Sequence, residues 1–205
     1  MINRVVSSRV RVWCRSRRAG TIWICVLVAS WVICFLSSRI GIPSIDPSIT
    51  VQDRPLEQLG TACVLFVGLV NVFVLREPVA WLVATSPLRL RYYRTLWLAF
   101  NTVLGLMFSV LTYPIFPQDV PIIRIATLWV LGFSFGVFAL VIFGHNLAFL
   151  GPFAVLLLFS TPKLVPWHLN LIYNVEVAKY LGVFTLCSYL SSVILFALKV
   201  DRQVI

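Results

Sequence analysis

The sequence predicts an all-α fold: a bundle of six transmembrane helices with both chain ends in the cytoplasm. Hydrophobic residues make up 60% of the 205 residues and charged residues only 12%, and the mean hydropathy is +0.96. Soluble domains carry about 25% charged residues. Several apolar runs approach the roughly 20 residues that cross a bilayer, and basic residues cluster beside them. The composition therefore indicates a protein whose solvent is lipid.

The first span is expected at residues 21–38, after a basic cytoplasmic segment at residues 1–20. A signal peptide has the same order of basic and apolar parts. This apolar run is long, contains Trp23 and Trp31, and ends without a small-x-small cleavage site. We therefore expect a retained helix. Residues 39–57 are rich in proline and acidic residues and are expected as an external loop that can hold a short interfacial helix.

The other spans follow from the remaining apolar runs. The second is expected at residues 58–75 and the third at 95–113, on either side of a cytoplasmic loop at 76–94, and a proline-rich external turn follows the third. Residues 125–161 are apolar for 37 residues, about 55 Å as one helix, which is too long for one crossing. A break at Gly144-His145-Asn146 gives spans at 125–143 and 147–161. Gly151-Pro152 interrupts the latter, and a re-entrant segment is its alternative.

The last span is expected at residues 177–198, before a cytoplasmic tail at 199–205. The charge distribution supports this topology, because the expected cytoplasmic segments hold twelve Lys and Arg and two acidic residues. The expected external segments hold five basic and five acidic residues. Cytoplasmic loops of membrane proteins carry such an excess of Lys and Arg. We therefore expect a multi-pass protein of the plasma membrane, with the lipid bilayer as its first partner.

The same features exclude several other classes. The net charge of +10 could indicate nucleic-acid binding, but the sequence shows no polar domain to carry a basic surface. The five cysteines lie in apolar runs or in the basic segment, with neither a zinc spacing nor a disulfide framework. We expect no metal, no cofactor and no catalytic site, since no paired buried acids or His-x-x-x-His pattern occurs.

The loop at residues 76–94 is the strongest candidate for a functional segment. Pro78 suits the first turn of a helix, where Glu77 complements the positive end. Trp81 can anchor that helix at the membrane surface, and Pro87 is expected to end it. Three arginines, Arg89, Arg91 and Arg94, then precede the third span. The simplest interpretation is an interfacial anchor with positive-inside charges.

A second interpretation rests on resemblance. The layout of six spans, an N-terminus inside and a long loop between spans two and three resembles the ABC-2 type transporter permease family. The pattern from Glu77 to Arg91 is similar to the loop of many small bacterial permease subunits. The resemblance implies that Glu77, Trp81, Arg89, Arg91 and Arg94 form a coupling segment that binds a cytoplasmic ATPase. The external hairpin between the last two spans is shorter here than in many family members, which leaves the substrate open.

The resemblance also implies partners, because this chain has no phosphate-binding loop of its own. We expect a separate ATPase subunit and either a homodimer or a second membrane subunit. One alternative is a non-transporting accessory or assembly subunit of a larger membrane complex. Another is the substrate-capture subunit of a vitamin-type importer, although the small-residue motif of that family's first helix is not evident.

Polar and small residues inside the spans are candidates for helix contacts. Gly132-x-x-x-Gly136 in the fourth span permits close helix approach, for which packing within the bundle is favoured over a dimer contact. Asn71 and Asn101 lie in neighbouring spans of opposite direction and can form a hydrogen bond between helices. His145, Asn146 and Glu176 lie at expected span boundaries, where water solvates them.

Overall fold

The structure is a computed structural model that describes residues 21–43, 56–73, 75, 87–115, 121–160, 164–166, 169, 170, 172 and 178–198. These residues form six α-helices: α2 (Thr21–Ser38), α3 (Leu59–Phe73), α5 (Pro87–Thr112), α6 (Ile122–Phe143), α7 (Leu150–Ser160) and α8 (Ala178–Leu198). Two short strands, β1 (Gly41–Pro43) and β2 (Leu56–Gln58), and two 3-10 turns, η1 (Tyr113–Ile115) and η2 (His145–Leu147), connect some of them. The all-helical prediction is therefore confirmed in the described residues, apart from one small strand pair.

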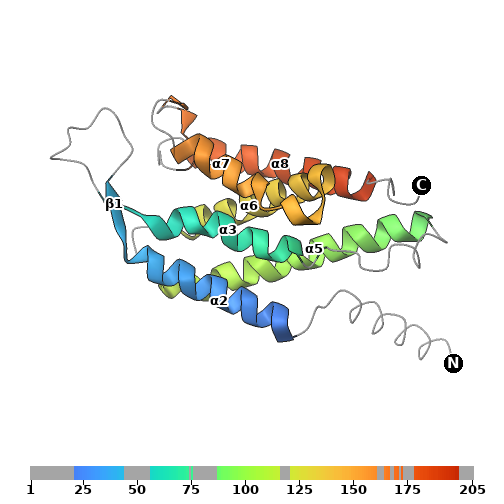
Figure 1. Cartoon of the computed structure of the whole chain (residues 1–205), viewed down its shortest axis with the longest axis horizontal. Helices are drawn as coiled ribbons and strands as arrows, with labels where there is room; N and C mark the ends of the chain where they lie inside the picture. The colour runs from blue at the N-terminus through green and yellow to red at the C-terminus, as the bar shows by residue number, and fades with distance from the viewer. Residues whose placement is uncertain are drawn as a thin grey trace.

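Consecutive helices run in opposite directions along one axis (Figure 1). The start of α2 and the end of α8 consequently lie at the same end of the bundle, and the strand pair lies at the other end (Figure 1). Helix α6 is central, because it packs against α3, α5, α7 and α8, whereas α2 packs mainly on α3.

The connection from α2 to α3 begins and ends in a short strand. Strands β1 and β2 pair antiparallel, with Ile42 opposite Glu57, and residues 44–55 of that loop lie outside the described part. The break after α6 agrees with the sequence, since α6 ends at Phe143 and Gly144 follows with φ of 84°. A positive φ is easily reached only by glycine, so Gly144 allows the chain to leave the helix there.

Helix lengths limit which elements can cross a bilayer alone. Within the described residues, α6 and the Tyr180–Leu198 part of α8 are long and apolar enough to do so. Helix α7 has 11 residues, about 17 Å, against a hydrocarbon core of about 30 Å. It is shorter than the expected fifth span because its first turn starts at Leu150, beside Gly151-Pro152. The six crossings and the N-in, C-in topology stay predictions.

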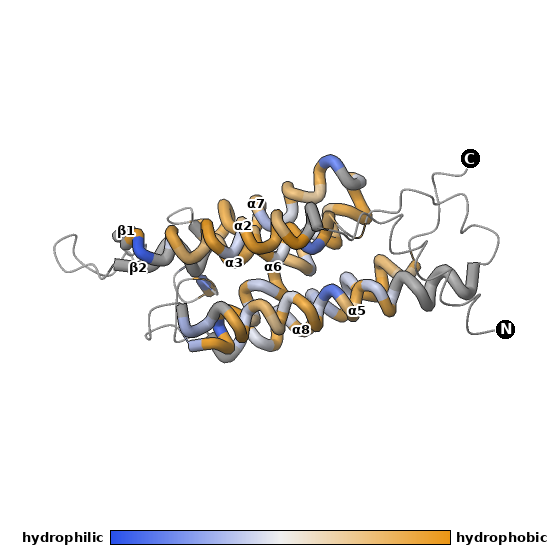
Figure 2. Tube along the Cα trace, turned by 90° about the horizontal axis from the view of Figure 1, so that it is seen from below, coloured by the Kyte–Doolittle hydropathy of each residue, from blue (hydrophilic) through white to orange (hydrophobic). Residues whose placement is uncertain are grey.

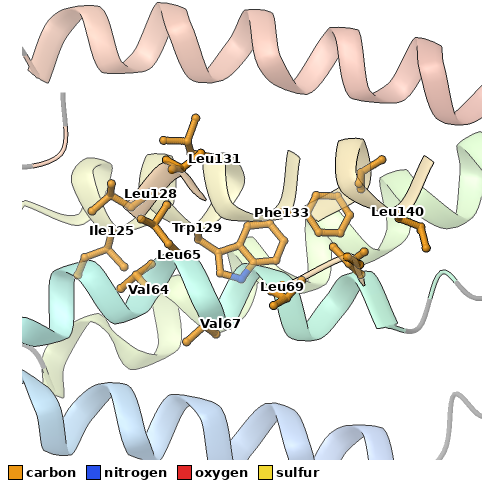
Figure 3. Close-up of a cluster of buried hydrophobic side chains, with 14 of the residues drawn as sticks. Val64, Leu65, Val67, Leu69, Ile125, Leu128, Trp129, Leu131, Phe133 and Leu140 are labelled. Carbon is orange, nitrogen blue, oxygen red and sulfur yellow. The ribbon is translucent and has the colours of Figure 1, made fainter. Parts of the chain in front are cut away.

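The core is formed where α6 meets α3. Trp129 stacks on Phe133 at 5.3 Å between ring centroids, and both side chains are fully buried. Aliphatic side chains of α3 and α6, labelled in Figure 3, surround this aromatic pair. Since a buried aromatic ring contributes 150–250 Å² of contact area as a rule, this cluster fixes the position of α6.

Many large apolar residues are exposed on the surface of the bundle, while some hydroxyl side chains are buried. Along α8, Thr185, Ser188 and Ser192 are buried, whereas Leu190 and Ile194 are more than half exposed. Helix α2 likewise exposes large apolar residues, among them Ile33 and Leu36. Figure 2 shows hydrophobic residues along most of the helical tubes. Monomeric soluble proteins rarely expose contiguous apolar areas above a few hundred Å².

Candidate functional site: helix α5 and its polar contact with α8

Helix α5 carries part of the predicted coupling segment. Residues 87–94, expected in the loop, form its first two turns, because the helix begins at Pro87. Proline suits the first helical position, where its missing N–H has no intrahelical acceptor to lose. Pro87 was expected to end a preceding helix, but in the structure it is the first residue of α5. Arg89, Arg91 and Arg94 thus lie on the backbone of α5, whereas Glu77 and Trp81 lie outside the described residues.

The buried stripe of α5 is polar. Asn101, Thr102, Gly105 and Ser109 are all buried. Their side chains first bond to their own helix: Asn101 Nδ2 donates to Trp97 O at 2.8 Å, Thr102 Oγ1 to Leu98 O at 2.9 Å and Ser109 Oγ to Gly105 O at 3.0 Å. Such bonds to the preceding turn satisfy the donors of polar side chains inside an apolar bundle.

Helix α8 presents its own polar stripe to this region. Thr102 Oγ1 and the Tyr189 hydroxyl lie 3.0 Å apart. Because the single Thr102 proton is donated to Leu98 O, Tyr189 is the donor and Thr102 the acceptor. Thr185 is one turn before Tyr189 and buried, and Ser192 Oγ donates to Tyr189 O at 2.8 Å. We call Asn101, Thr102, Thr185, Tyr189 and Ser192 the α5–α8 seam.

Several polar atoms of the interior have no hydrogen-bond partner among the described residues. Among them are Nδ2 and Oδ1 of Asn71, Oδ1 of Asn101 and Oγ1 of Thr185. The expected hydrogen bond between Asn71 and Asn101 is therefore not formed. Unsatisfied buried polar atoms are few in native proteins, and inside membranes polar side chains are commonly functional. The α5–α8 seam and the Asn71 side chain are thus polar features of the described core with unsatisfied atoms.

Thr102, Thr185, Tyr189 and Ser192 were not among the site residues predicted from the sequence. Their spacing was an available signal, because Thr185, Tyr189 and Ser192 recur at intervals of four and three residues on one face of a helix. Hydroxyl side chains on one face of an otherwise apolar span indicate a contact with another helix.

The glycines of α6 lie against α3 of the same chain. A Cβ added at Gly132 would meet Leu65 backbone atoms, among them C and Cα at 2.7 Å, and one at Gly136 would meet Val72 Cγ2 at 2.8 Å. On the other side of the same crossing, a Cβ at Gly68 would meet Phe133 N at 2.7 Å. Helices α3 and α6 therefore pack almost backbone to backbone, with no room for a side chain.

Polar residues near the bundle ends form hydrogen bonds between helices and the segments that connect them. Arg124, in the first turn of α6, donates from Nη2 to Ile172 O, and Asn170 Nδ2 donates to Phe159 O at 2.9 Å. Both bonds attach the segment between α7 and α8 to helix ends. Of the other expected boundary residues, Asn146 is exposed in the η2 turn, and Glu176 lies outside the described part.

The chemistry of the seam is that of hydroxyls and amides, which bind polar groups by hydrogen bonds. Among the described residues, no group of three or more His, Cys, Asp and Glu side chains could hold a metal ion. Comparison with known protein families, with curated proteins and with solved structures finds no match for this chain.

Proposed function

We propose that the chain is a multi-pass plasma-membrane protein that serves as the permease subunit of an ABC-type exporter. In this proposal six helices cross the bilayer with both chain ends in the cytoplasm. A separate cytoplasmic ATPase binds the segment that leads into α5, and a second copy or another membrane subunit completes the pathway.

The exposed apolar faces of the helices support the membrane location. The exposed faces of α2, α5 and α8 are formed largely by aliphatic and aromatic side chains, while hydroxyl and amide groups lie inside. In water this arrangement would expose apolar surface and bury polar groups, both of which cost free energy. In a bilayer the same arrangement places apolar groups against lipid.

The geometry of α5 supports a coupling role and is the observation on which this part of the proposal rests. The helix has 26 residues, about 39 Å, and runs without a break from Pro87 to Thr112. Its first turns carry Arg89, Arg91 and Arg94, and its middle packs on α6 and bonds to α8 through Tyr189. A displacement of the arginine end would therefore be transmitted along a continuous helix to the seam.

Charge reversal tests the coupling role. We expect replacement of Arg89, Arg91 and Arg94 by Glu to release an ATPase that copurifies with the wild-type chain in mild detergent. The ATPase would be measured by ATP hydrolysis in the purified complex and identified by its phosphate-loop sequence. Arg39→Glu is the control, because Arg39 is exposed and lies beyond the opposite end of α2. Unchanged hydrolysis in the triple variant would refute the coupling role.

Trp81→Ala provides a second test of the same proposal. If the predicted interfacial helix transmits motion, the complex that contains the variant should be as abundant as the wild type. It should hydrolyse ATP but show no vectorial transport in sealed vesicles. A variant that loses protein and activity in parallel would indicate a structural anchor only.

An accessory or assembly subunit is the second candidate, and the crossing of α3 and α6 favours it. Gly68 and Gly132 bring the two backbones together, which resists sliding of one helix past the other. Such a rigid pair suits lateral contacts in a larger complex. In this case mutation of the arginines would change complex stability, and vesicles would show no vectorial activity.

A further inference from the structure

Two cysteines lie at the same height on neighbouring helices, near the end of the bundle that carries the strand pair. Helix α2 ends at Ser38 and α3 begins at Leu59, and β1 and β2 pair antiparallel between them. Cys34 lies four residues before the end of α2, and Cys63 lies four residues after the start of α3. At about 1.5 Å per residue, each cysteine is about 6 Å from the end of its helix. The two cysteines are therefore level with each other across the α2–α3 contact.

Cys34 faces α3. Leu27, Trp31 and Cys34 are all buried, and they recur at intervals of four and three residues, so they form one face of α2. Helix α2 packs mainly on α3. The buried face of α2 is therefore the one that is turned toward α3.

Cys63 lies on the side of α3 that is turned away from α6. The contact of α3 with α6 includes Leu65, Gly68 and Val72. Val72 is nine residues after Cys63, which is about two and a half turns of an α-helix, so the two side chains leave α3 in opposite directions. Helix α3 lies between α2 and α6 (Figure 1), and Cys63 is nevertheless partly buried and packed against the core. Cys63 therefore faces α2.

The packing of α2 on α3 thus brings two thiols together. Both side chains are thiols in the structure, and they are close enough to interact electrostatically. No disulfide was expected from the sequence, because both cysteines lie in apolar runs. A disulfide requires two Cα atoms within about 4.4–6.8 Å, which only residues at a direct contact between helices can meet. Level positions on facing sides of α2 and α3 are such a contact.

We propose that Cys34 and Cys63 form a disulfide that joins α2 to α3 near the strand pair. The inference rests on the topology proposed above, which places this end of the bundle outside the cytoplasm, where disulfides form and persist. The bond closes the connection between the two helices into a ring. It holds α2, which packs mainly on α3, against the rest of the bundle.

The oxidant is a disulfide, either of a small molecule or of a thiol oxidoreductase. Cys63 reacts first, because its side chain is partly exposed whereas that of Cys34 is fully buried. The Cys63 thiolate attacks one sulfur of the oxidant, which forms a mixed disulfide and releases one thiolate. The Cys34 thiolate then attacks Sγ of Cys63 and expels the second thiolate. The two protons lost by the cysteines go to the two released thiolates, so one disulfide is reduced as the other forms.

Counting thiols tests the proposal. The full chain is taken from membranes into acid, denatured without reductant and treated with a maleimide that adds one polyethylene glycol chain to each thiol. The chain has five cysteines, so one disulfide leaves three labels in the wild type. Cys34→Ala and Cys63→Ala should each raise the number to four, because the partner thiol is released. Cys25→Ala and Cys187→Ala are matched controls, since both cysteines are exposed, and each should lower the number to two. After reduction the wild type should carry five labels.

The outcomes separate this inference from the topology beneath it. Five labels in the unreduced wild type would overturn the disulfide, and two labels in Cys63→Ala would show that Cys34 pairs with a different cysteine. The topology is tested with Ile40→Cys, since Ile40 is exposed and precedes β1. A membrane-impermeant maleimide should label this variant in intact cells. Labelling only after permeabilisation would overturn the proposed topology, while the thiol count decides the disulfide independently.

Discussion

Replacement of Gly132 by alanine tests the packing of the central helices. The added methyl group would lie 2.7 Å from Leu65 C and Cα, atoms of a helix backbone that cannot rotate away. An ordinary contact between carbon atoms is about 3.5–4.0 Å. Helices α3 and α6 would therefore have to separate by about 1 Å at this point, and the contacts around the crossing would loosen.

The expected magnitude combines two opposing effects. Overpacking in a close-packed core costs about 1–3 kcal/mol and occasionally more. Alanine gains about 0.8–1.0 kcal/mol over glycine as a helix former. We expect a loss near the upper part of the overpacking range, because backbone atoms must move, and hence a net destabilisation of about 1–2 kcal/mol. For a chain of this length that is a fall in Tm of roughly 2–8 °C.

Gly182→Ala is the matched control, because a Cβ at Gly182 would meet no atom within 4 Å. It keeps the gain in helix propensity and adds no clash, so its Tm should equal or exceed that of the wild type. Thermal unfolding of both variants is followed in the same mild detergent by circular dichroism at 222 nm. A Gly132→Ala protein as stable as Gly182→Ala would refute the close approach of α3 and α6.

Two further predictions concern contacts of α5. Tyr189→Phe removes the hydrogen-bond donor to Thr102 and should lower the free energy of unfolding by about 0.5–1.5 kcal/mol. Adding Thr102→Val should lower it little further, so a double-mutant cycle measured by thermal unfolding should show coupling between the two positions. Additive losses would contradict the hydrogen bond. Gly105→Ala would push a methyl group into the indole ring of Trp129, with Cε2 at 2.5 Å, and should lower the Tm. Combination with Trp129→Leu should recover part of that loss, whereas a further fall in Tm would show that the ring is not the obstacle.

Much of the helical layout could be predicted from hydropathy alone. Each of the six expected ranges contains a helix, since long apolar runs form helices in either lipid or a buried core. The end of α6 at Phe143 could be predicted because Gly144 and two polar residues follow it. The start of α5 was placed too late, because hydropathy records where apolar residues begin, whereas Pro87 and the arginines can begin a helix outside the apolar run.

The side-chain contacts could not be predicted in the same way. Lipid-facing and core-facing positions of a span are both apolar, so the alternation that marks the buried face of a soluble helix is weak here. Gly132 and Gly136 indicated a close approach, but only the packing of the bundle identified α3 as the partner. The α5–α8 seam depends on two helices that are 87 positions apart at Thr102 and Tyr189.

The sequence by itself determined the apolar composition, the helical ranges and the clustering of basic residues, because these are properties of single segments. The tertiary structure decided which faces of those segments meet. It placed Asn101 and Ser109 on the buried side of α5 and left Met107 and Val110 exposed. The physical reason is that a face of a helix is defined only by its neighbours, and these come from distant parts of the chain.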